Sequence, residues 1–225
     1  PKTRWKECPK CQARMKELGL KDEEELQGWF VLQAVDFLKK HGKTAIVWNE
    51  SLNSGMMPND IIVQRWMDKK DRAVEFANKG GKMIVSEFYY YYCDYPFGMT
   101  SLKKTYSLDP YIKGLTETGR KNVFGVECPI WTEYVRDFDR LSYMCFPRFW
   151  AVAEAGWTKR SNMDYNSFEE RFEALRPMLE ELGIKPAPRS DWNPNPLRCL
   201  SELRKFFKGT ASASDIKNMI HNNHA

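Results

Sequence analysis

Residues 61–86 read IIVQRWMDKKDRAVEFANKGGKMIVS, in which two apolar runs flank a helical segment. The runs at 61–66 and 82–86 are short and rich in Ile and Val, as buried strands are. Between them, 71–78 has helical spacing, and the pair Gly80-Gly81 ends the helix. A strand, a helix and a second strand joined by short turns predict two parallel strands with the helix packed on their sheet.

The same alternation continues in both directions along the chain. Two further apolar strands are expected at 44–48 and 123–127. Other helices are expected at 8–18, 22–41, 110–113, 135–156 and 167–182. Four strands that are apolar throughout indicate a parallel sheet covered on both faces, either an open doubly wound sheet or part of a (β/α)8 barrel. No glycine-rich phosphate motif follows any strand, which disfavours the nucleotide-binding form of the open sheet.

The composition is that of a globular protein and argues against several classes. Of the 225 residues, 42% are hydrophobic and 29% charged, and no apolar run is long enough to predict a membrane span. The formal charge is +5, but 185–225 alone holds seven Lys and Arg against three Asp and Glu. The body is therefore nearly neutral, so no nucleic-acid surface is expected. Eight tryptophans stand out, because indole faces are what sugars stack against.

The cysteines and histidines do not indicate a metal site, a cofactor site or a catalytic nucleophile. Six cysteines show no regular disulfide framework. Cys8 and Cys11 have the spacing of half a zinc site, but no second pair follows. Of three histidines, His41 adjoins Gly42 and is interpreted as a helix cap. We therefore expect neither a metal site nor a histidine-dependent mechanism.

Aromatic and acidic side chains follow the predicted strands at the point where each strand ends. They are Trp48, Trp66, Tyr92, Asp94, Trp131 and Glu133. In a (β/α)8 enzyme the active site is built at the carboxyl ends of the strands, so these side chains would share one rim. Core packing or a partner surface could also use three tryptophans, but the combination with a tyrosine and acids favours a sugar-binding rim.

Four runs together resemble a known family. They are WNESLNSGMMPNDIIVQRW (48–66), SEFYYYYCDYPFG (86–98), GVECPIWTEYV (125–135) and FPRFWAVAEAGW (146–157). In order and spacing they resemble the second half of the catalytic barrel of family 20 glycoside hydrolases, the exo-acting β-N-acetylhexosaminidases. The resemblance covers roughly 1–184 and implies that the four strands are the fifth to eighth of a (β/α)8 barrel.

The resemblance also implies roles for the rim residues. The tryptophans at 48, 66 and 131 would enclose the acetamido methyl group and support the ring of a terminal GlcNAc or GalNAc. Tyr92 would hold the acetamido carbonyl oxygen, a role that passes to Tyr91 if the register shifts by one. Asp94 and Glu133 would bind sugar hydroxyls. In the family's substrate-assisted reaction the acetamido oxygen attacks the anomeric carbon, so the protein supplies position rather than a nucleophile.

One departure from the family pattern is decisive for activity. The family's adjacent Asp-Glu pair, which follows two glycines, is missing: Lys82 follows Gly80-Gly81, and the acids at 22–25 suit a helix start. The pair is expected upstream of Pro1, so the chain alone should be inactive. It would complete a barrel with an upstream half or associate with a second copy. A non-catalytic sugar-binding half-barrel and a different sugar-processing barrel are the alternatives; Glu127 and Glu154 are interpreted as structural.

The carboxyl-terminal region lies beyond the resemblance. We place the half-barrel at 1–184 and a proline-rich linker with a helical tail at 185–225. Residues 197–208 have the pattern of a basic amphipathic helix that packs on the barrel or docks to a partner. The last 14 residues are expected to be frayed.

Overall fold

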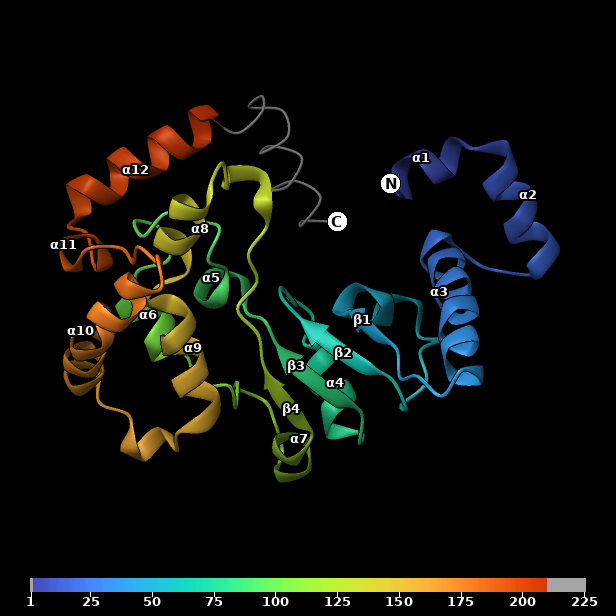
Figure 1. Ribbon diagram of the computed structural model, residues 1–225. Coiled ribbons are helices and arrows are strands. Elements are labelled where there is room, and N and C mark those ends of the chain that lie inside the picture. Colours follow the sequence, from blue (N-terminus) through green and yellow to red (C-terminus); the bar gives the residue numbers. More distant parts are fainter. Residues whose placement is uncertain (1, 210–225) are drawn as a thin grey trace. The chain divides into compact units, whose positions relative to one another are not determined.

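A computed structural model describes residues 2–209 of the chain, with the elements labelled in Figure 1. Its internal contacts divide it into two compact units. Among the described residues, the strand unit comprises 2–88 and 110–127, and the helical unit comprises 89–109 and 128–209. Among the described residues, no helix combines the length and apolar character that crossing a membrane requires.

The strand unit contains a four-stranded parallel sheet in chain order. Its strands are β1 (Ile46–Trp48), β2 (Ile62–Arg65), β3 (Lys82–Val85) and β4 (Val123–Val126). All three neighbouring pairs are parallel, and the register shifts once, at β3 opposite β4. The predicted strands are confirmed to within two residues at each end. Within the described chain, β1 and β4 are the outer strands of the sheet (Figure 1).

The helices of the strand unit are α1 (Lys2–Glu7), α2 (Pro9–Leu18), α3 (Glu23–Lys40), α4 (Arg72–Asn78) and α7 (Glu117–Lys121). The predicted helix at 8–18 continues towards the amino terminus as α1, with Cys8 as the cap between α1 and α2. The Asp22 carboxylate caps α3 by accepting from the Glu25 amide at 2.9 Å, and His41 ends it, as expected. A Cβ on Gly28 would lie 2.4 Å from the Ser54 Cβ, so this glycine lets α3 approach the 3₁₀ helix η1 (Asn49–Ser54) closely.

The core of the strand unit forms where α4 covers the sheet. Helix α4 buries Ala73 and Ala77 completely, and Met83 and Val85 of β3 are fully buried too. A Cβ on Gly81 would lie only 2.1 Å from the Phe76 ring, so the turn into β3 needs a glycine. The predicted strand–helix–strand unit is therefore stabilised by its small and apolar side chains and by the glycine turn, the same features from which it was predicted.

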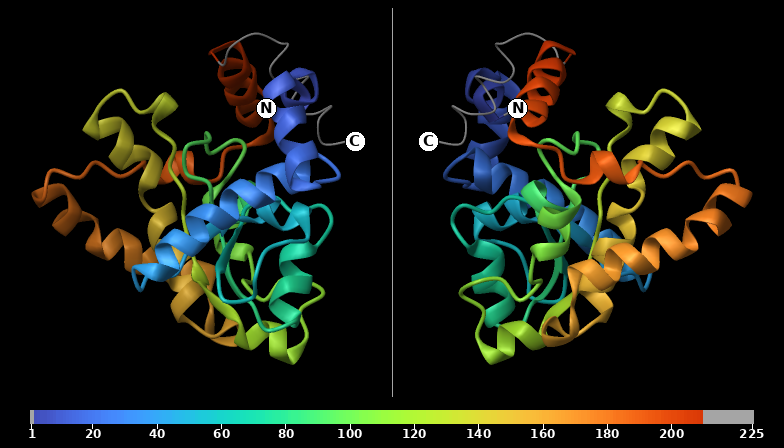
Figure 2. Two further views of the ribbon diagram at one scale, coloured as in Figure 1. Left: turned by 90° about the vertical axis from the view of Figure 1, so that its right-hand side faces the viewer. Right: turned by 90° about the vertical axis from the view of Figure 1, so that its left-hand side faces the viewer.

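The helical unit packs seven helices within the described residues. They are α5 (Phe88–Tyr91, starting at the last residue of the strand unit), α6 (Leu102–Ser107), α8 (Phe138–Cys145), α9 (Arg148–Trp157), α10 (Tyr165–Glu181), α11 (Arg189–Trp192) and α12 (Pro196–Gly209). The long α10, orange in Figure 2, contributes Phe168 and Phe172 to the buried core. The proline-rich segment after α10 adds Trp192, whose indole donates to the Ala187 carbonyl at 2.8 Å.

Two helix predictions need correction. No helix forms at 110–113; the nearby helices are α6 and α7, where Ser101 and Thr116 accept amide hydrogen bonds as caps and Pro110 supplies no amide donor. The single helix predicted at 135–156 is two helices, α8 and α9, because the chain becomes extended at Phe146 and Pro147 cannot donate. The last 14 residues, predicted to be frayed, lie outside the described residues.

Candidate functional site

The predicted rim residues fall into two groups. Trp48 and Trp66 belong to the strand unit. Tyr92, Asp94, Trp131 and Glu133 belong to the helical unit. Each group has its own supporting contacts.

In the strand unit, the two tryptophans lie together at the carboxyl ends of β1 and β2. Their rings are 6.3 Å apart and nearly perpendicular. The buried Asn49 side chain joins the two strand ends: its Oδ1 accepts from the Trp66 amide at 3.0 Å, and its Nδ2 donates to the Met67 carbonyl at 3.1 Å. The strand order thus brings two indoles that are 18 residues apart into one aromatic corner.

Glu50 fixes the orientation of the Trp66 indole. Its Oε1 accepts from the indole Nε1 at 2.6 Å, and the Phe88 ring lies edge-on to the indole at 5.6 Å. The second carboxylate oxygen of Glu50 is buried and makes no hydrogen bond within the described residues. Sequence reasoning did not select Glu50, although an acid two residues after Trp48 was the available signal.

Glu127 connects the carboxyl-terminal parts of β2, β3 and β4. One of its oxygens accepts from the Ser86 hydroxyl at 2.8 Å and also from the Gln64 side-chain amide. Gln64, Ser86 and Glu127 lie at or just beyond the ends of β2, β3 and β4, respectively. This agrees with the structural role expected for Glu127.

In the helical unit, Tyr92 and Asp94 are both 3% exposed. Asp94 Oδ1 is buried without a hydrogen-bond partner among the described residues. Burial raises the pKa of Asp94 to about 6, the Arg148 charge opposes this, and the Glu133 charge adds to it. A buried carboxylate oxygen with no partner is costly to maintain and is ready to accept a hydrogen bond from a ligand.

Trp131 and Glu133 are more exposed than the other members of this group. Trp131 is 48% exposed and precedes the 3₁₀ helix η2 (Thr132–Tyr134). Glu133 acts electrostatically on both Asp94 and Tyr95, so the structure brings the two predicted sugar-binding carboxylates into one neighbourhood. The alternative residue, Tyr91, is fully buried, its hydroxyl has no hydrogen-bond partner within residues 2–209, and burial raises its pKa.

A pair of cysteines joins the two segments that carry these residues. The Sγ atoms of Cys93 and Cys128 are 2.7 Å apart, and both are free thiols. Cys128 Sγ also donates to the Tyr91 carbonyl at 2.9 Å, while the Cys93 amide donates to the Pro129 carbonyl at 2.9 Å. Cysteine spacing in the sequence gave no indication of this contact.

Arg148 supports the backbone on both sides of Asp94. Its fully buried guanidinium donates to the carbonyls of Cys93 at 2.6 Å and Tyr95 at 2.9 Å. Further bonds go to the Thr100 and Met144 carbonyls, and the guanidinium lies over the Phe97 ring at 4.2 Å. A lone arginine in an otherwise apolar stretch was the only sequence signal for this role.

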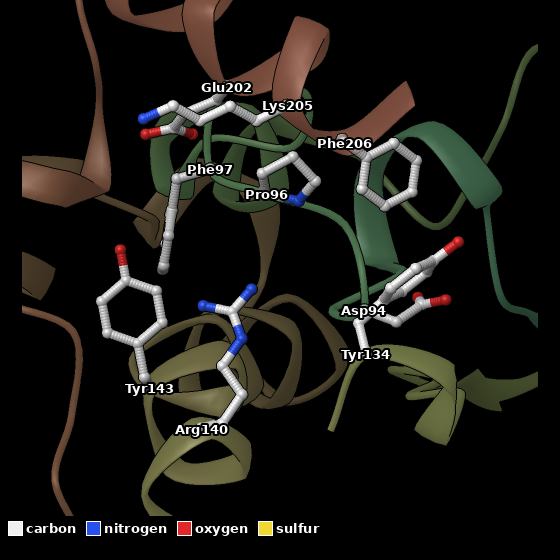
Figure 3. Close-up of a pocket in the computed structure, with 9 residues that line it drawn as sticks. All are labelled: Asp94, Pro96, Phe97, Tyr134, Arg140, Tyr143, Glu202, Lys205 and Phe206. Atoms are coloured by element: carbon white, nitrogen blue, oxygen red, sulfur yellow. The ribbon is translucent and has the colours of Figure 1, made fainter. Parts of the chain in front are cut away.

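A pocket of about 370 Å³ opens beside Asp94. It is lined by Asp94, Pro96, Phe97, Tyr134, Arg140, Tyr143, Glu202, Lys205 and Phe206 (Figure 3). In Figure 3 the Arg140 guanidinium points from α8 toward the middle of this space. Within residues 2–209, no cluster of three His, Cys, Asp or Glu residues could hold a metal ion.

Comparison with known families identifies the family of the chain. The family model described as glycosyl hydrolase family 20, catalytic domain, matches residues 1–160. The chain belongs to glycosyl hydrolase family 20. The resemblance of the four sequence runs to this family is thereby confirmed.

Curated relatives in family 20 are longer than this chain. A beta-hexosaminidase from Porphyromonas gingivalis is 34% identical over 196 residues, which are 82% of this chain and 25% of that protein. A beta-hexosaminidase from Vibrio furnissii is 30% identical over 165 residues, 68% of this chain and 27% of that protein. The chain thus spans about a quarter of the length of these relatives.

Solved family 20 structures confirm the fold class. The exo-β-N-acetylglucosaminidase of Vibrio harveyi, solved with N-acetylglucosamine, matches with a TM-score of 0.74 and 28% identity over 82% of this chain and 31% of that one. A β-N-acetylhexosaminidase from Bacteroides fragilis gives a TM-score of 0.72 and 25% identity over 87% of this chain and 42% of that one. The four parallel strands are therefore part of a (β/α)8 barrel.

Proposed function

We propose that this chain supplies the sugar pocket of a β-N-acetylhexosaminidase that removes terminal, non-reducing β-linked GlcNAc or GalNAc. The observation that carries the proposal is Asp94: a buried carboxylate with an unpartnered oxygen, in the electrostatic neighbourhood of Glu133, on a segment of a family 20 chain. Sugar hydroxyls are the donors that such an oxygen lacks. The Vibrio harveyi relative was solved with N-acetylglucosamine, which supports the same class of ligand here.

The roles follow the chemistry of the ligand. Asp94 and Glu133 accept hydrogen bonds from sugar hydroxyls, and Trp131 offers its exposed indole face to the apolar face of the ring. The aromatic corner of Trp48 and Trp66 encloses the acetamido methyl group. Tyr92 donates to the acetamido carbonyl oxygen and holds it in line for attack on the anomeric carbon. The mechanism is substrate-assisted and retains the anomeric configuration.

The general acid has to come from elsewhere. No Gly-Gly-Asp-Glu occurs in the 225 residues. The acids at 22–25 are engaged in local contacts: Asp22 caps α3, Glu23 accepts from Gln12 at 3.1 Å, and Glu24 and Glu25 pair with Lys2 and Lys21. We propose that an Asp-Glu pair on the other half of the barrel supplies the residue that orients the acetamido group and the general acid that protonates the leaving oxygen.

Activity measurements test this proposal. The chain alone should not hydrolyse an aryl β-GlcNAc glycoside, and addition of an amino-terminal half-barrel carrying Gly-Gly-Asp-Glu should produce hydrolysis with retained configuration. The missing acid pair also suits a second function, a non-catalytic sugar-binding protein. That function would be favoured if the chain binds GlcNAc but the assembled barrel stays inactive.

A further inference from the structure

Helix α12 contacts both segments that carry the proposed sugar-binding carboxylates. The Phe206 ring lies 5.3 Å from the Tyr95 ring and 4.9 Å from the Tyr134 ring. Tyr95 directly follows Asp94, and Tyr134 directly follows Glu133. One side chain of α12 therefore touches the immediate neighbour of each carboxylate, and the contacts have the separations of attractive aromatic pairs.

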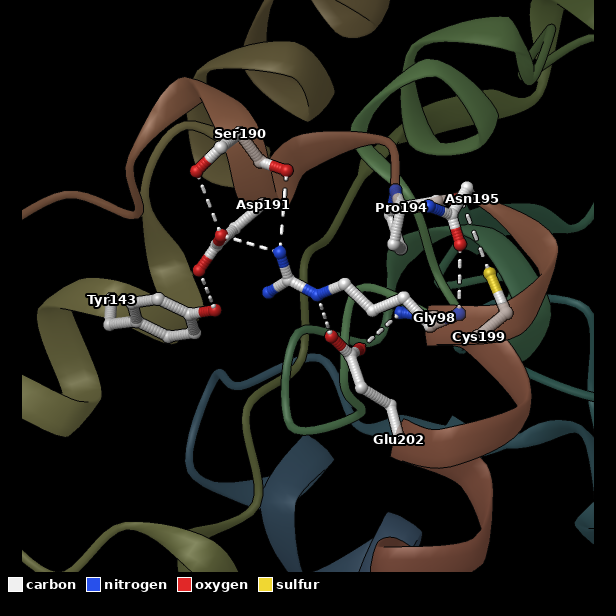
Figure 4. Close-up of polar contacts among 9 residues, drawn as sticks. Gly98, Tyr143, Ser190, Asp191, Pro194, Asn195, Cys199 and Glu202 are labelled. Carbon is white, nitrogen blue, oxygen red and sulfur yellow. Dashed lines mark hydrogen bonds and ion pairs between the residues drawn. The ribbon is translucent and has the colours of Figure 1, made fainter.

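Polar contacts also hold α12 against the loop that follows Asp94. Glu202 Oε2 accepts from the Gly98 amide at 2.8 Å, and Glu202 Oε1 accepts from Arg198 Nε at 2.7 Å (Figure 4). Arg198 Nη1 also donates to Asp191 Oδ1 at 2.7 Å, and Asp191 Oδ2 accepts from the Tyr143 hydroxyl at 2.7 Å. This network spans the loop after Asp94, α8, α11 and α12, so it restrains the helix from several sides.

Gly98 allows the helix to rest directly on the loop. A Cβ at this position would lie 2.9 Å from the Cys199 Cα, a backbone atom of α12, and 3.0 Å from the Glu202 carboxylate. No side chain can be accommodated there unless the helix moves. The backbone of α12 is thus packed against the segment four residues after Asp94, which leaves little freedom between helix and loop.

Helix α12 also forms one wall of the pocket beside Asp94. It contributes Glu202, Lys205 and Phe206 to the lining (Figure 3). Two other apolar side chains of the helix lie largely in solvent, because Leu197 is 81% exposed and Leu200 is 49% exposed. Among these three apolar side chains, Phe206 is the one whose ring contacts both carboxylate segments.

We propose that α12 is a positioning element of the sugar pocket and that Phe206 is the positioning residue through which it aligns Asp94 and Glu133. The inference rests on the proposed function, because it assumes that these carboxylates bind sugar hydroxyls. Phe206 acts by fixing the backbone beside each carboxylate. Displacement of the two carboxylates would weaken the hydroxyl contacts that hold the sugar, so loss of the Phe206 ring should be visible in substrate binding.

Kinetics of the barrel assembled with its amino-terminal half test the role of Phe206. Phe206→Ala should lower kcat/KM for an aryl β-GlcNAc glycoside about tenfold, mainly through KM, because hydroxyl contacts already form in the bound substrate. Phe206→Tyr keeps the ring and should restore nearly all of the loss. Leu197→Ala removes an exposed apolar side chain from the same helix and should leave kcat and KM unchanged. A helix that only covers apolar surface would lower Tm in Phe206→Ala and leave KM at its original value.

A double-mutant cycle separates positioning from general damage. In an Asp94→Asn background, Phe206→Ala should lower kcat/KM by clearly less than in the parent barrel, because one of the two contacts that Phe206 aligns is already weakened. Fully additive losses would overturn the inference, as would unchanged kinetics of Phe206→Ala in an active barrel. An inactive parent barrel would instead count against the proposed function.

Hydrogen exchange of the 225-residue chain provides a test that does not depend on activity. Phe206→Ala should accelerate amide exchange at 94–98 and 132–135, whereas Leu197→Ala should not. Equal exchange in these two segments for Phe206→Ala and the parent chain would refute a positioning role for α12.

Discussion

At the scale of single residues, Asp94 shows how a binding group can oppose stability. Burial raises its pKa to about 6, above the ordinary value of 3.8, so the folded state holds the proton more tightly than the unfolded state. The stabilising effect of the protonated form is complete below pH 3.8 and is lost as the pH rises through 6. At neutral pH the ionised carboxylate therefore lowers the free energy of unfolding.

We predict that Asp94→Asn stabilises the chain at neutral pH and not in acid. The gain should grow between about pH 4 and pH 6 and reach about 1–2 kcal/mol after allowance for solvent screening. Urea denaturation of both proteins at several pH values across this range measures it. A difference in unfolding free energy that does not change with pH would show that burial of Asp94 has no such effect.

Tyr92 should affect the rate more than binding. If its hydroxyl holds the acetamido oxygen mainly in the transition state, Tyr92→Phe should lower kcat about 10²-fold with little change in KM. Steady-state kinetics of the assembled barrel measure both constants. Tyr91→Phe is the matched control, because Tyr91 is also buried and its hydroxyl has no partner among the described residues. A loss in the control instead of in Tyr92→Phe would show that the register is shifted by one residue.

Asp94, Tyr92 and the tryptophans were predicted as site residues from the residue types that follow the strands. The residues that hold them were not, because support depends on which distant segments meet. Cys93 and Cys128 contact each other across 34 intervening residues, and Arg148 reaches carbonyls about 50 residues earlier in the chain. Neither relation leaves a local pattern, so only a three-dimensional structure reveals it.

At the scale of elements, the strands were predictable because their signal is local. Each apolar run is bounded by turn residues, and the glycine pair before β3 marks its start. The helix predicted at 110–113 is wrong: the neighbouring helices begin after Ser101 and Thr116, whose side chains cap them. Caps identified these helix starts better than composition did.

Arg148 connects elements, and its replacement should disturb more than one of them. Arg148→Met would leave carbonyls of the loop 93–100 without donors in a buried setting, and we expect a loss of about 3 kcal/mol or more in unfolding free energy. Arg148→Lys keeps the charge but not the planar fork and should recover only part of this loss. Urea denaturation of the three proteins measures it. If Arg148→Lys had the same free energy of unfolding as the parent chain, the positive charge alone would explain the stabilising effect of Arg148.

At the scale of the whole molecule, the outer strands of the sheet predict association. Backbone groups along the free sides of β1 and β4 favour pairing with another chain. Large apolar side chains of the strand unit are exposed as well: Ile46 of β1 by 55%, Phe124 of β4 by 61%, and Phe30 and Phe37 of α3 by 69% and 61%. Surfaces of this kind are usually covered in solution.

We therefore predict that the chain does not persist as a monomer. It should form a one-to-one complex with an amino-terminal half-barrel, or pair with a second copy when that half is absent. Sedimentation velocity over a range of concentrations measures both states. A monodisperse monomer at high concentration, indifferent to the added half, would contradict this prediction. The number of strands in the complete barrel did not follow from the four strands alone and required the resemblance to family 20.

The contact between Cys93 and Cys128 gives the chain a built-in reporter. Burial and the neighbouring Cys93 raise the pKa of Cys128 well above its ordinary value, whereas hydrogen bonds from Cys11 lower the pKa of Cys8. Iodoacetamide, which attacks thiolates, should therefore modify Cys8 rapidly and Cys128 only when the segments around it separate. Mass spectrometry of timed alkylation would follow that opening. Protection of Cys128 by added GlcNAc would then report occupancy of the pocket, and rapid alkylation of Cys128 in the free chain would show that the segments are already apart.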